Sequence, residues 1–139
     1  MRADGAHHRT LRVPATPECL ERVHALLADL LGDVADVAEA DRLGFETALA
    51  ELVANVIEHA GAREPVRLVV VLAADPAALT ADLYDDGPPA GTDPAGASLP
   101  DPSAERGRGL ALARAAVDEV TYAREAGANH WSMTRRRRA

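Results

Sequence analysis

The sequence predicts one domain of the α+β class, with a sheet and about three helices. Segments in which apolar and polar residues alternate, as in strands that bury one face, occur near both ends of the chain and in its middle. Segments with a helical spacing of apolar residues lie between them. Short turn-forming stretches, residues 74–78 and 125–128, separate two pairs of strands and indicate antiparallel hairpins. A chain of 139 residues can bury an ordinary core without a disulfide or a metal.

The expected elements follow one another along the chain. Residues 8–14 alternate in polarity and end at Pro14, as in a strand. Thr16 and Pro17 are typical of a helix start, and Gly32 follows the last apolar position of that helix. The later expected elements are a helix at 41–61, strands at 66–73 and 79–85, a helix at 108–117, and strands at 120–124 and 129–134.

The expected helix at residues 41–61 carries a polar stripe. Glu51, Asn55 and His59 follow one another at intervals of four residues, so they lie along one side of the helix. The same helix has a broad apolar surface, and the stripe therefore borders or interrupts a core. A buried amide or carboxylate without a partner costs about 1–3 kcal/mol. This alignment suggests a metal ion and a phosphorylated ligand; the alternative is an exposed helix edge that carries three polar side chains.

Two downstream segments carry further candidate binding residues. A strand stops at Asp85-Asp86-Gly87, which places a carboxylate at the end of the strand. Gly107 and Gly109 stand immediately ahead of the next expected helix, where glycines let backbone N–H groups approach an anion. Taken singly, the first segment is most often a turn and the second a loop.

Taken together, these three segments resemble the motifs of the GHKL, or Bergerat-fold, ATPases, which include histidine-kinase-like ATP-binding domains. The motifs are Glu-x-x-x-Asn on a helix, Asp-x-Gly after a strand, and Gly-x-Gly before a helix. The stretches Ala-Glu-Leu-Val-Ala-Asn-Val-Ile-Glu-His-Ala and Gly-Arg-Gly-Leu-Ala-Leu-Ala-Arg look like those of the anti-sigma-factor serine/threonine kinases of bacterial partner switching. The resemblance implies a two-layer α/β sandwich, with a mixed, mostly antiparallel sheet covered on one face by about three helices.

The resemblance also implies roles for individual residues. Asp85, rather than Asp86, would accept a hydrogen bond from the adenine amino group, and Gly87 would let the backbone lie close to the base. Asn55 would hold Mg²⁺ between the phosphates. Glu51 would act as the general base, or would orient the attacking hydroxyl. Glu51 is therefore the expected catalytic residue.

The expected phosphate-binding segment is the start of the helix at 108–117. By the resemblance, Gly107, Arg108, Gly109 and Leu110 would bind the nucleotide there. His59, one turn beyond Asn55, would either touch the nucleotide site or have a capping or structural role.

Residues 87–105 form a long proline-rich segment with five of the nine prolines of the chain. A loop of this length in a compact domain is either functional or disordered. GHKL proteins keep their mobile nucleotide lid between the corresponding motifs, so we expect a lid or a remnant of one. Pro88 and Pro89 depart from the family, which usually has small, glycine-rich sequence at that point.

The resemblance implies an ATP-binding regulatory serine/threonine protein kinase and anti-sigma factor, with ATP and Mg²⁺ as cofactors. Its partners would be a sigma factor and the antagonist protein that it phosphorylates, and a homodimer through the first strand and helix is possible. One alternative is a catalytically inactive nucleotide-binding module that sequesters its partner. Another is a small ATPase that transfers phosphate to water. The expected organisation is a flexible segment at 1–9, the ATP-binding domain at 10–135, and a basic tail at 136–139.

Composition limits the other classes of function. A net charge of −7 argues against a general nucleic-acid binder, and we expect residues 135–138, four consecutive arginines, to form a solvated, frayed tail. Cys19 is the only cysteine, so a reducing cytoplasm is the expected compartment. The chain has no apolar run of about 18 residues, the length that would indicate a membrane span.

Overall fold

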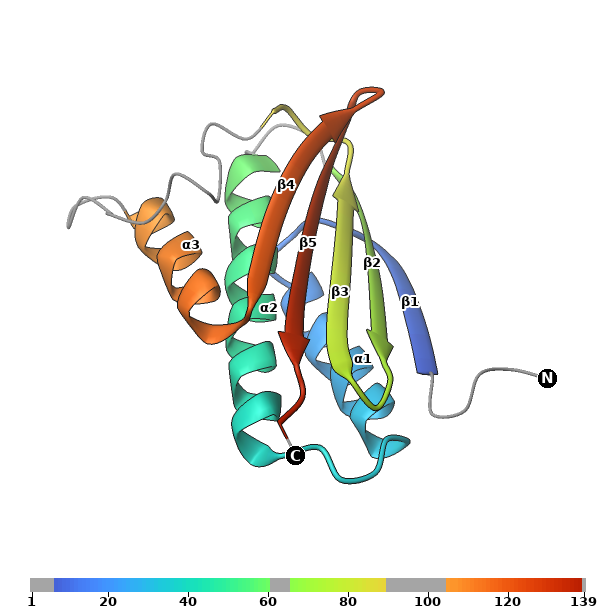
Figure 1. Ribbon diagram of the computed structural model, residues 1–139. Coiled ribbons are helices and arrows are strands. Elements are labelled where there is room, and N and C mark those ends of the chain that lie inside the picture. Colours follow the sequence, from blue (N-terminus) through green and yellow to red (C-terminus); the bar gives the residue numbers. More distant parts are fainter. Residues whose placement is uncertain (1–6, 61–65, 90–104, 139) are drawn as a thin grey trace.

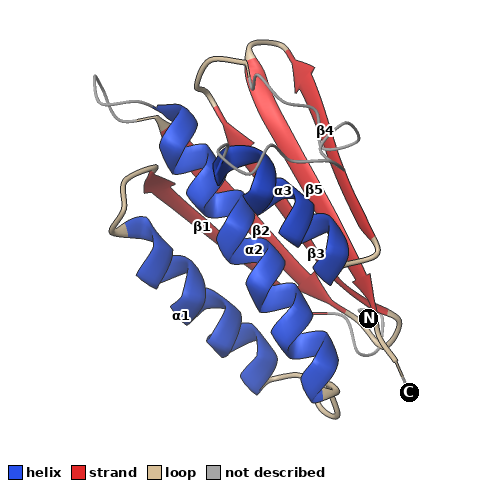
Figure 2. Cartoon of the chain, turned by 90° about the vertical axis from the view of Figure 1, so that its left-hand side faces the viewer, coloured by secondary structure: helices blue, strands red, loops and turns tan. Residues whose placement is uncertain are grey.

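The structure is a computed structural model that describes residues 7–60, 66–89 and 105–138; the side chains of 59–60 and 105–108 lie outside the description. The described elements form two layers, with the helices together on one face of the sheet (Figures 1 and 2). In chain order they are β1 His7–Pro14, α1 Cys19–Gly32, α2 Glu39–Ala60, β2 Arg67–Ala74, β3 Ala78–Asp85, α3 Glu105–Ala116, β4 Glu119–Glu125 and β5 Ala128–Arg136. The expected α+β sandwich is confirmed.

The five described strands form one sheet in the order β1-β2-β3-β5-β4. All four neighbouring pairs are antiparallel, including both expected hairpins. The last strand in sequence, β5, lies between β3 and β4 and not at an edge. The register of β3 and β5 places Asp85 directly opposite Asn129, and this pair becomes part of the candidate site.

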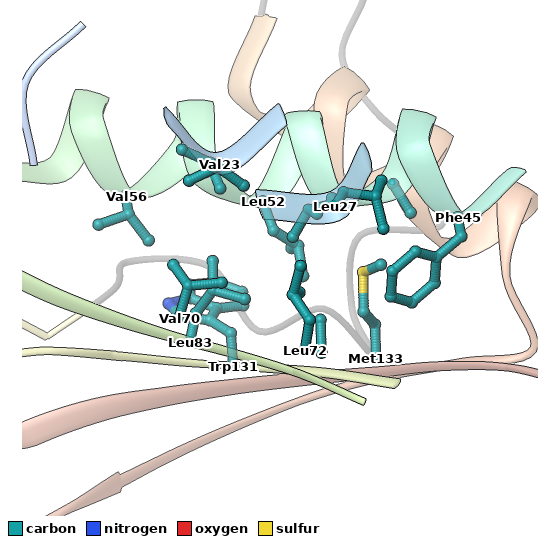
Figure 3. Packing of buried hydrophobic residues seen from close by; sticks show 14 of the residues in the cluster. Val23, Leu27, Phe45, Leu52, Val56, Val70, Leu72, Leu83, Trp131 and Met133 are labelled. Carbon is teal, nitrogen blue, oxygen red and sulfur yellow. The ribbon is translucent and has the colours of Figure 1, made fainter. Parts of the chain in front are cut away.

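The core lies between the sheet and the helices. The residues of β2 and β3 alternate in burial, and apolar side chains on one face point toward α1 and α2. Figure 3 shows Trp131 and Leu83 of the sheet below Val56 of α2, and Met133 beside Phe45. Trp131 and Phe45 are the largest side chains with less than 2% of their surface exposed. This packing holds the middle of α2 firmly against the sheet.

All three helices begin at residues other than the expected ones, and α2 begins at Glu39, two residues before the expected start at Asp41. Helix α1 begins at Cys19, because Thr16 and Pro17 form a tight turn whose carbonyl groups accept hydrogen bonds from Cys19 and Leu20 at 2.9 and 3.3 Å. Helix α3 begins at Glu105, three residues earlier than the sequence predicts.

No helix among residues 7–60, 66–89 and 105–138 combines the length and the apolar character that crossing a membrane requires.

The N-terminal boundary of the domain also differs from the expected one. Residues 7–9 belong to β1 and pair with β2, although the sequence suggests that the flexible segment extends to residue 9. The Arg9 guanidinium donates to Asp29 at 2.6 Å and also to Asp33, two carboxylates at the end of α1. The sheet therefore begins at least three residues before the expected domain boundary.

The expectation of a solvated, frayed tail at residues 135–138 is wrong, because these arginines are tied to the domain by hydrogen bonds. Arg135 Nε donates to Asp41 Oδ1 at 2.9 Å, and the backbone N–H of Arg138 donates to Asp41 Oδ2 at 2.7 Å. The Asp41 side chain is fully buried, with 0% of its surface exposed. The Arg137 guanidinium donates to backbone carbonyl groups of two loops at 2.7–3.1 Å. The end of β5 is thereby fastened to the start of α2.

Candidate functional site

Three elements carry the residues of the candidate site to the same end of the sandwich. They are the C-terminal half of α2, the end of β3 and the start of α3 (Figures 1 and 2). Helices α2 and α3 run side by side in opposite directions, as Figure 2 shows. The sequence predicts the same three segments as the functional ones.

Glu51 on α2 lies against the start of α3. A Cβ atom built on Gly109 would stand 2.7 Å from Glu51 Oε1, closer than real Cβ contacts come. Gly109 therefore leaves room for the Glu51 carboxylate, and a larger residue would displace it. Glu51 is half-buried. This contact brings two of the predicted site residues together.

Asn55, one turn further along α2, is buried without a partner for its amide. Only 6% of its surface is exposed, and neither Nδ2 nor Oδ1 makes a hydrogen bond within the part of the chain that the structure describes. Leaving such groups unpaired costs about 1–3 kcal/mol. An amide oxygen is among the ligands that Mg²⁺ takes in proteins, so this side chain fits a metal-bound ligand.

Asp85 stands at the end of β3 and is also buried, with 6% of its surface exposed. Its Oδ1 accepts hydrogen bonds from the Gly87 N–H and from Asn129 Nδ2, each at 2.9 Å. No described residue donates to its second oxygen. Asp86 is exposed, and its Oδ1 accepts from the Arg67 N–H at 2.8 Å. Asp85 is thus the carboxylate that faces the interior, as the spacing of the motif predicts.

Gly87 completes the turn after β3. A Cβ atom at this position would lie 3.1 Å from Asp85 Oδ1 and 3.2 Å from a methyl group of Val66. Such distances are tighter than most real Cβ contacts, so the turn has little room for a side chain. The absence of a side chain keeps the backbone of residue 87 close to Asp85.

The glycines of the third motif are placed differently from the expectation. Gly107 and Gly109 lie within the first turns of α3, and not ahead of the helix. The side chain of Leu110 is buried in the core with 1% exposure, so only its backbone can face a ligand. The side chains of Arg108 and His59, and residues 90–104 of the expected lid, lie outside the described part of the chain.

Sequence reasoning missed Asn129, which contacts Asp85 from the β4–β5 hairpin, and Tyr122 and Arg124, which contact Asn129. Asn129 is 2% exposed and donates to Asp85 Oδ1. Its signal in the sequence is its register, because it shares an inward face with Trp131 at a distance of two residues. A polar residue at an inward position of a strand needs a buried partner, and this rule could have identified Asn129.

A separate cavity of about 460 Å³ lies at the ends of β1 and β2, lined by residues 12–14 and 66–69. None of Glu51, Asn55, Asp85 and Gly109 is among these lining residues. Val66 lines the cavity and also stands beside Gly87, and Leu68, another lining residue, is the β2 partner of Asp85. The motif residues, and not this cavity, define the candidate site.

The fold and the arrangement of the three motifs define a domain of the GHKL ATPase class. The profile of the histidine kinase-like ATPase domain matches residues 13–135, most of the chain. The chain belongs to this family, and the resemblance seen in its sequence is confirmed.

A solved structure supports the same fold. The chain is similar to the crystal structure of the RsbU and RsbW domains of Rv1364c from Mycobacterium tuberculosis, with a TM-score of 0.62 and 24% sequence identity. The match covers 94% of this chain but only 33% of that one. No curated protein matches the chain. The structural similarity therefore establishes the fold, and the family profile establishes the ATPase class.

Proposed function

We propose that this domain is an ATP-binding regulatory serine/threonine protein kinase and anti-sigma factor that acts in partner switching and phosphorylates an antagonist protein. The observation that carries the proposal is the buried amide of Asn55, which has no partner among the described residues. It lies one helical turn from a carboxylate for which Gly109 leaves room. A buried amide without a partner lowers stability, and a bound ligand that makes the missing contacts explains why it is there.

The described residues fit Mg·ATP. Asn55 would supply an oxygen ligand to Mg²⁺, and the free oxygen of Asp85 would accept from an exocyclic amino group of the base. Gly107, in the first turn of α3, would lie along the phosphates, where the helix dipole favours negative charge, and Gly109 in the next turn leaves room for Glu51. When bound, Mg·ATP supplies the γ-phosphoryl group, and its metal ion neutralises the charge that builds up during transfer. Positioning and charge neutralisation account for most of the rate of such reactions.

Glu51 would be the catalytic residue. Its carboxylate would take the proton of the acceptor hydroxyl while that oxygen bonds to the γ-phosphorus and ADP leaves. Glu51 is half-buried beside Gly109, and its exposed part would face the partner protein. RsbW is the name of a domain in the similar structure and not of this chain. That this chain has a sigma factor and an antagonist as partners is therefore part of the proposal.

The test compares Glu51→Gln with the wild type and with Glu46→Gln, a matched change of an acid on the same helix. Radiolabelled ATP is incubated with each protein and a candidate antagonist, and Mg·ATP affinity is measured by calorimetry. We expect Glu51→Gln to transfer phosphate at least about a hundredfold more slowly, with affinity within about threefold of the wild type. Glu46→Gln should retain both properties. Full transfer in Glu51→Gln would show that the assignment of the base is wrong.

A second candidate function is a nucleotide-binding interaction module without turnover, and Pro88 and Pro89 favour it. Prolines restrict the backbone where the family usually has flexible sequence, and the carbonyl group of Pro88 is held by Asn129 Nδ2 at 2.8 Å. Tight binding of Mg·ATP with no phosphorylated product would support this function. Release of phosphate with no acceptor protein present would instead support a simple ATPase.

A further inference from the structure

The β4–β5 hairpin contributes a buried hydrogen-bond network to the candidate site. Asn129 is at its centre, 2% exposed and directly opposite Asp85 in the sheet. Its neighbours Tyr122 and Arg124 lie on β4, on the same side of the hairpin. These residues belong to none of the three family motifs.

Hydrogen bonds from both its nitrogen and its oxygen fix the orientation of the Asn129 amide. Its Nδ2 donates to Asp85 Oδ1 at 2.9 Å and to the Pro88 carbonyl group at 2.8 Å, with the Gly87 carbonyl group more distant at 3.5 Å. Its Oδ1 accepts from Arg124 Nη1 at 3.1 Å and from the Tyr122 hydroxyl. A flipped amide would place a donor against two donors and an acceptor against two acceptors. The amide therefore has one favourable orientation, in contrast to the amide of Asn55, which has no partner among the described residues.

The same network holds the backbone after β3. Arg124 Nη1 also donates to the Gly87 carbonyl group at 2.7 Å, so one guanidinium spans the hairpin and the Asp-x-Gly turn. The Tyr122 ring is tilted against Trp131, with ring centroids 4.6 Å apart, and this contact anchors the network in the core. The position of Asp85 thus depends on β4 and β5 as well as on its own strand.

This arrangement has a consequence for the two oxygens of Asp85. Asn129 and the Gly87 N–H both donate to Oδ1, and no described residue donates to Oδ2. An ionised carboxylate oxygen accepts hydrogen bonds and cannot donate them. A purine with a 6-amino group would satisfy Oδ2, whereas a 6-oxo group would oppose it with a second acceptor.

We infer that Asn129 is a positioning residue that sets the preference of the site for 6-aminopurine over 6-oxopurine nucleotides, with Tyr122 and Arg124 holding its amide. The inference rests on the proposed nucleotide-binding function. Asn129 acts through Asp85, because its own amide is fully occupied by protein groups. Without it, only the Gly87 N–H holds Asp85 Oδ1, and the direction of the other oxygen is less firmly fixed.

The experiment measures the dissociation constants of Mg·ATP and of Mg·inosine triphosphate by calorimetry. The two ligands differ at position 6 of the purine, where one has an amino and the other an oxo group. We expect the wild type to prefer ATP on the order of a hundredfold, as sites built to hydrogen-bond one group reject its replacement. Asn129→Leu should reduce this ratio about tenfold or more, and Tyr122→Phe by a smaller factor.

Ser132→Ala is the matched control, since Ser132 lies on the same strand and faces away from the core, three residues from Asn129. The ratio of the two dissociation constants should be the same in Ser132→Ala as in the wild type. If Asn129 had only a structural role, Asn129→Leu would weaken the binding of both nucleotides equally and leave the ratio unchanged. That result would overturn this inference but not the proposed function. If Asn129→Leu does not fold, Tyr122→Phe decides, because it keeps the ring on Trp131 and removes only the hydroxyl. A wild type that binds neither nucleotide would overturn the proposed function, and this inference with it.

Discussion

Replacement of Asp41 by Asn should destabilise the domain strongly, although Asp41 lies in the first turn of α2 and the site residues of that helix lie in its C-terminal half. Its carboxylate is fully buried and accepts from Arg135 Nε at 2.9 Å and from the Arg138 N–H at 2.7 Å. The side chain of Arg135 is itself only 14% exposed. Gly44, nearly one turn further along α2, leaves the space in which this guanidinium lies, because a Cβ atom there would stand 2.7 Å from Nη1.

The expected loss follows from these contacts. Breaking a buried ion pair by removing one partner costs about 3–5 kcal/mol, because the remaining charge stays buried without compensation. Asparagine keeps an oxygen for Arg135, but its amide nitrogen then faces the Arg138 N–H, which is also a donor. For a domain of this size a loss of 1 kcal/mol lowers the melting temperature by about 3–5 °C, so the total decrease should be about 10–20 °C.

Thermal and urea unfolding, followed by circular dichroism, measure this loss. Asp29→Asn is the matched control, because the Asp29 carboxylate also bonds an arginine but its side chain is 68% exposed. Exposed ion pairs contribute about 0–1 kcal/mol, so the control should stay close to the wild type. A double-mutant cycle with Arg135→Met isolates the pair itself. A loss below about 1 kcal/mol in Asp41→Asn would contradict this expectation, since it would mean that the buried charges are not coupled.

The pH dependence gives a second measurement on the same residue. Burial alone would raise the pKa of Asp41, but the hydrogen bonds from the Arg138 N–H and Arg135, with both guanidinium charges, outweigh burial and lower that pKa below its usual value. The stabilisation is therefore present above the unfolded-state pKa of about 4 and is lost as the pH falls through the lower folded-state pKa. The wild type should lose stability in this acidic range, and Asp41→Asn should lose less.

Two further predictions concern the candidate site. Asn55→Leu should raise the free energy of unfolding by about 1 kcal/mol without nucleotide, because it removes unpaired buried polar atoms, and should abolish Mg·ATP binding. Urea unfolding and calorimetry measure the two effects; a destabilised variant that still binds Mg·ATP would contradict the role of Asn55. Gly109→Ala should gain up to about 1 kcal/mol in helix propensity but displace the Glu51 carboxylate, which leaves stability nearly unchanged and slows phosphoryl transfer. Transfer at the wild-type rate in that variant would show that the position of Glu51 is not critical.

Local patterns in the sequence predict most of the fold. Polarity alternation gives the strands, and the turn-forming stretch at 74–78 predicts the β2–β3 hairpin. The start of α3 is the main error among the helices. Gly107 lowers helix propensity, so the sequence alone favours a start after it, at Arg108. Packing of α3 on α2, where Gly109 makes room for Glu51, overrides that local preference.

Long-range partners explain what the sequence could not reveal. Consecutive arginines look like a solvated tail because nothing near them in the chain offers an opposite charge. Their acceptor, Asp41, lies 94 residues from Arg135, and only the folded structure brings the two together. The same holds for Asn129 and Asp85, which are 44 residues apart. By contrast, Glu51 and Asn55 are predictable because a single helix determines their relative positions.

The position of β5 inside the sheet constrains how this domain can assemble. The strand supplies Trp131 and Met133 to the core and pairs with β3 on one side and β4 on the other. During synthesis, β1 to β3 can form a partial sheet before β5 exists, but one edge of that sheet remains open until the last described strand has left the ribosome. Release of a chain shortened before β5 would therefore expose an unpaired strand and half of a core, a species prone to aggregate rather than a smaller folded domain.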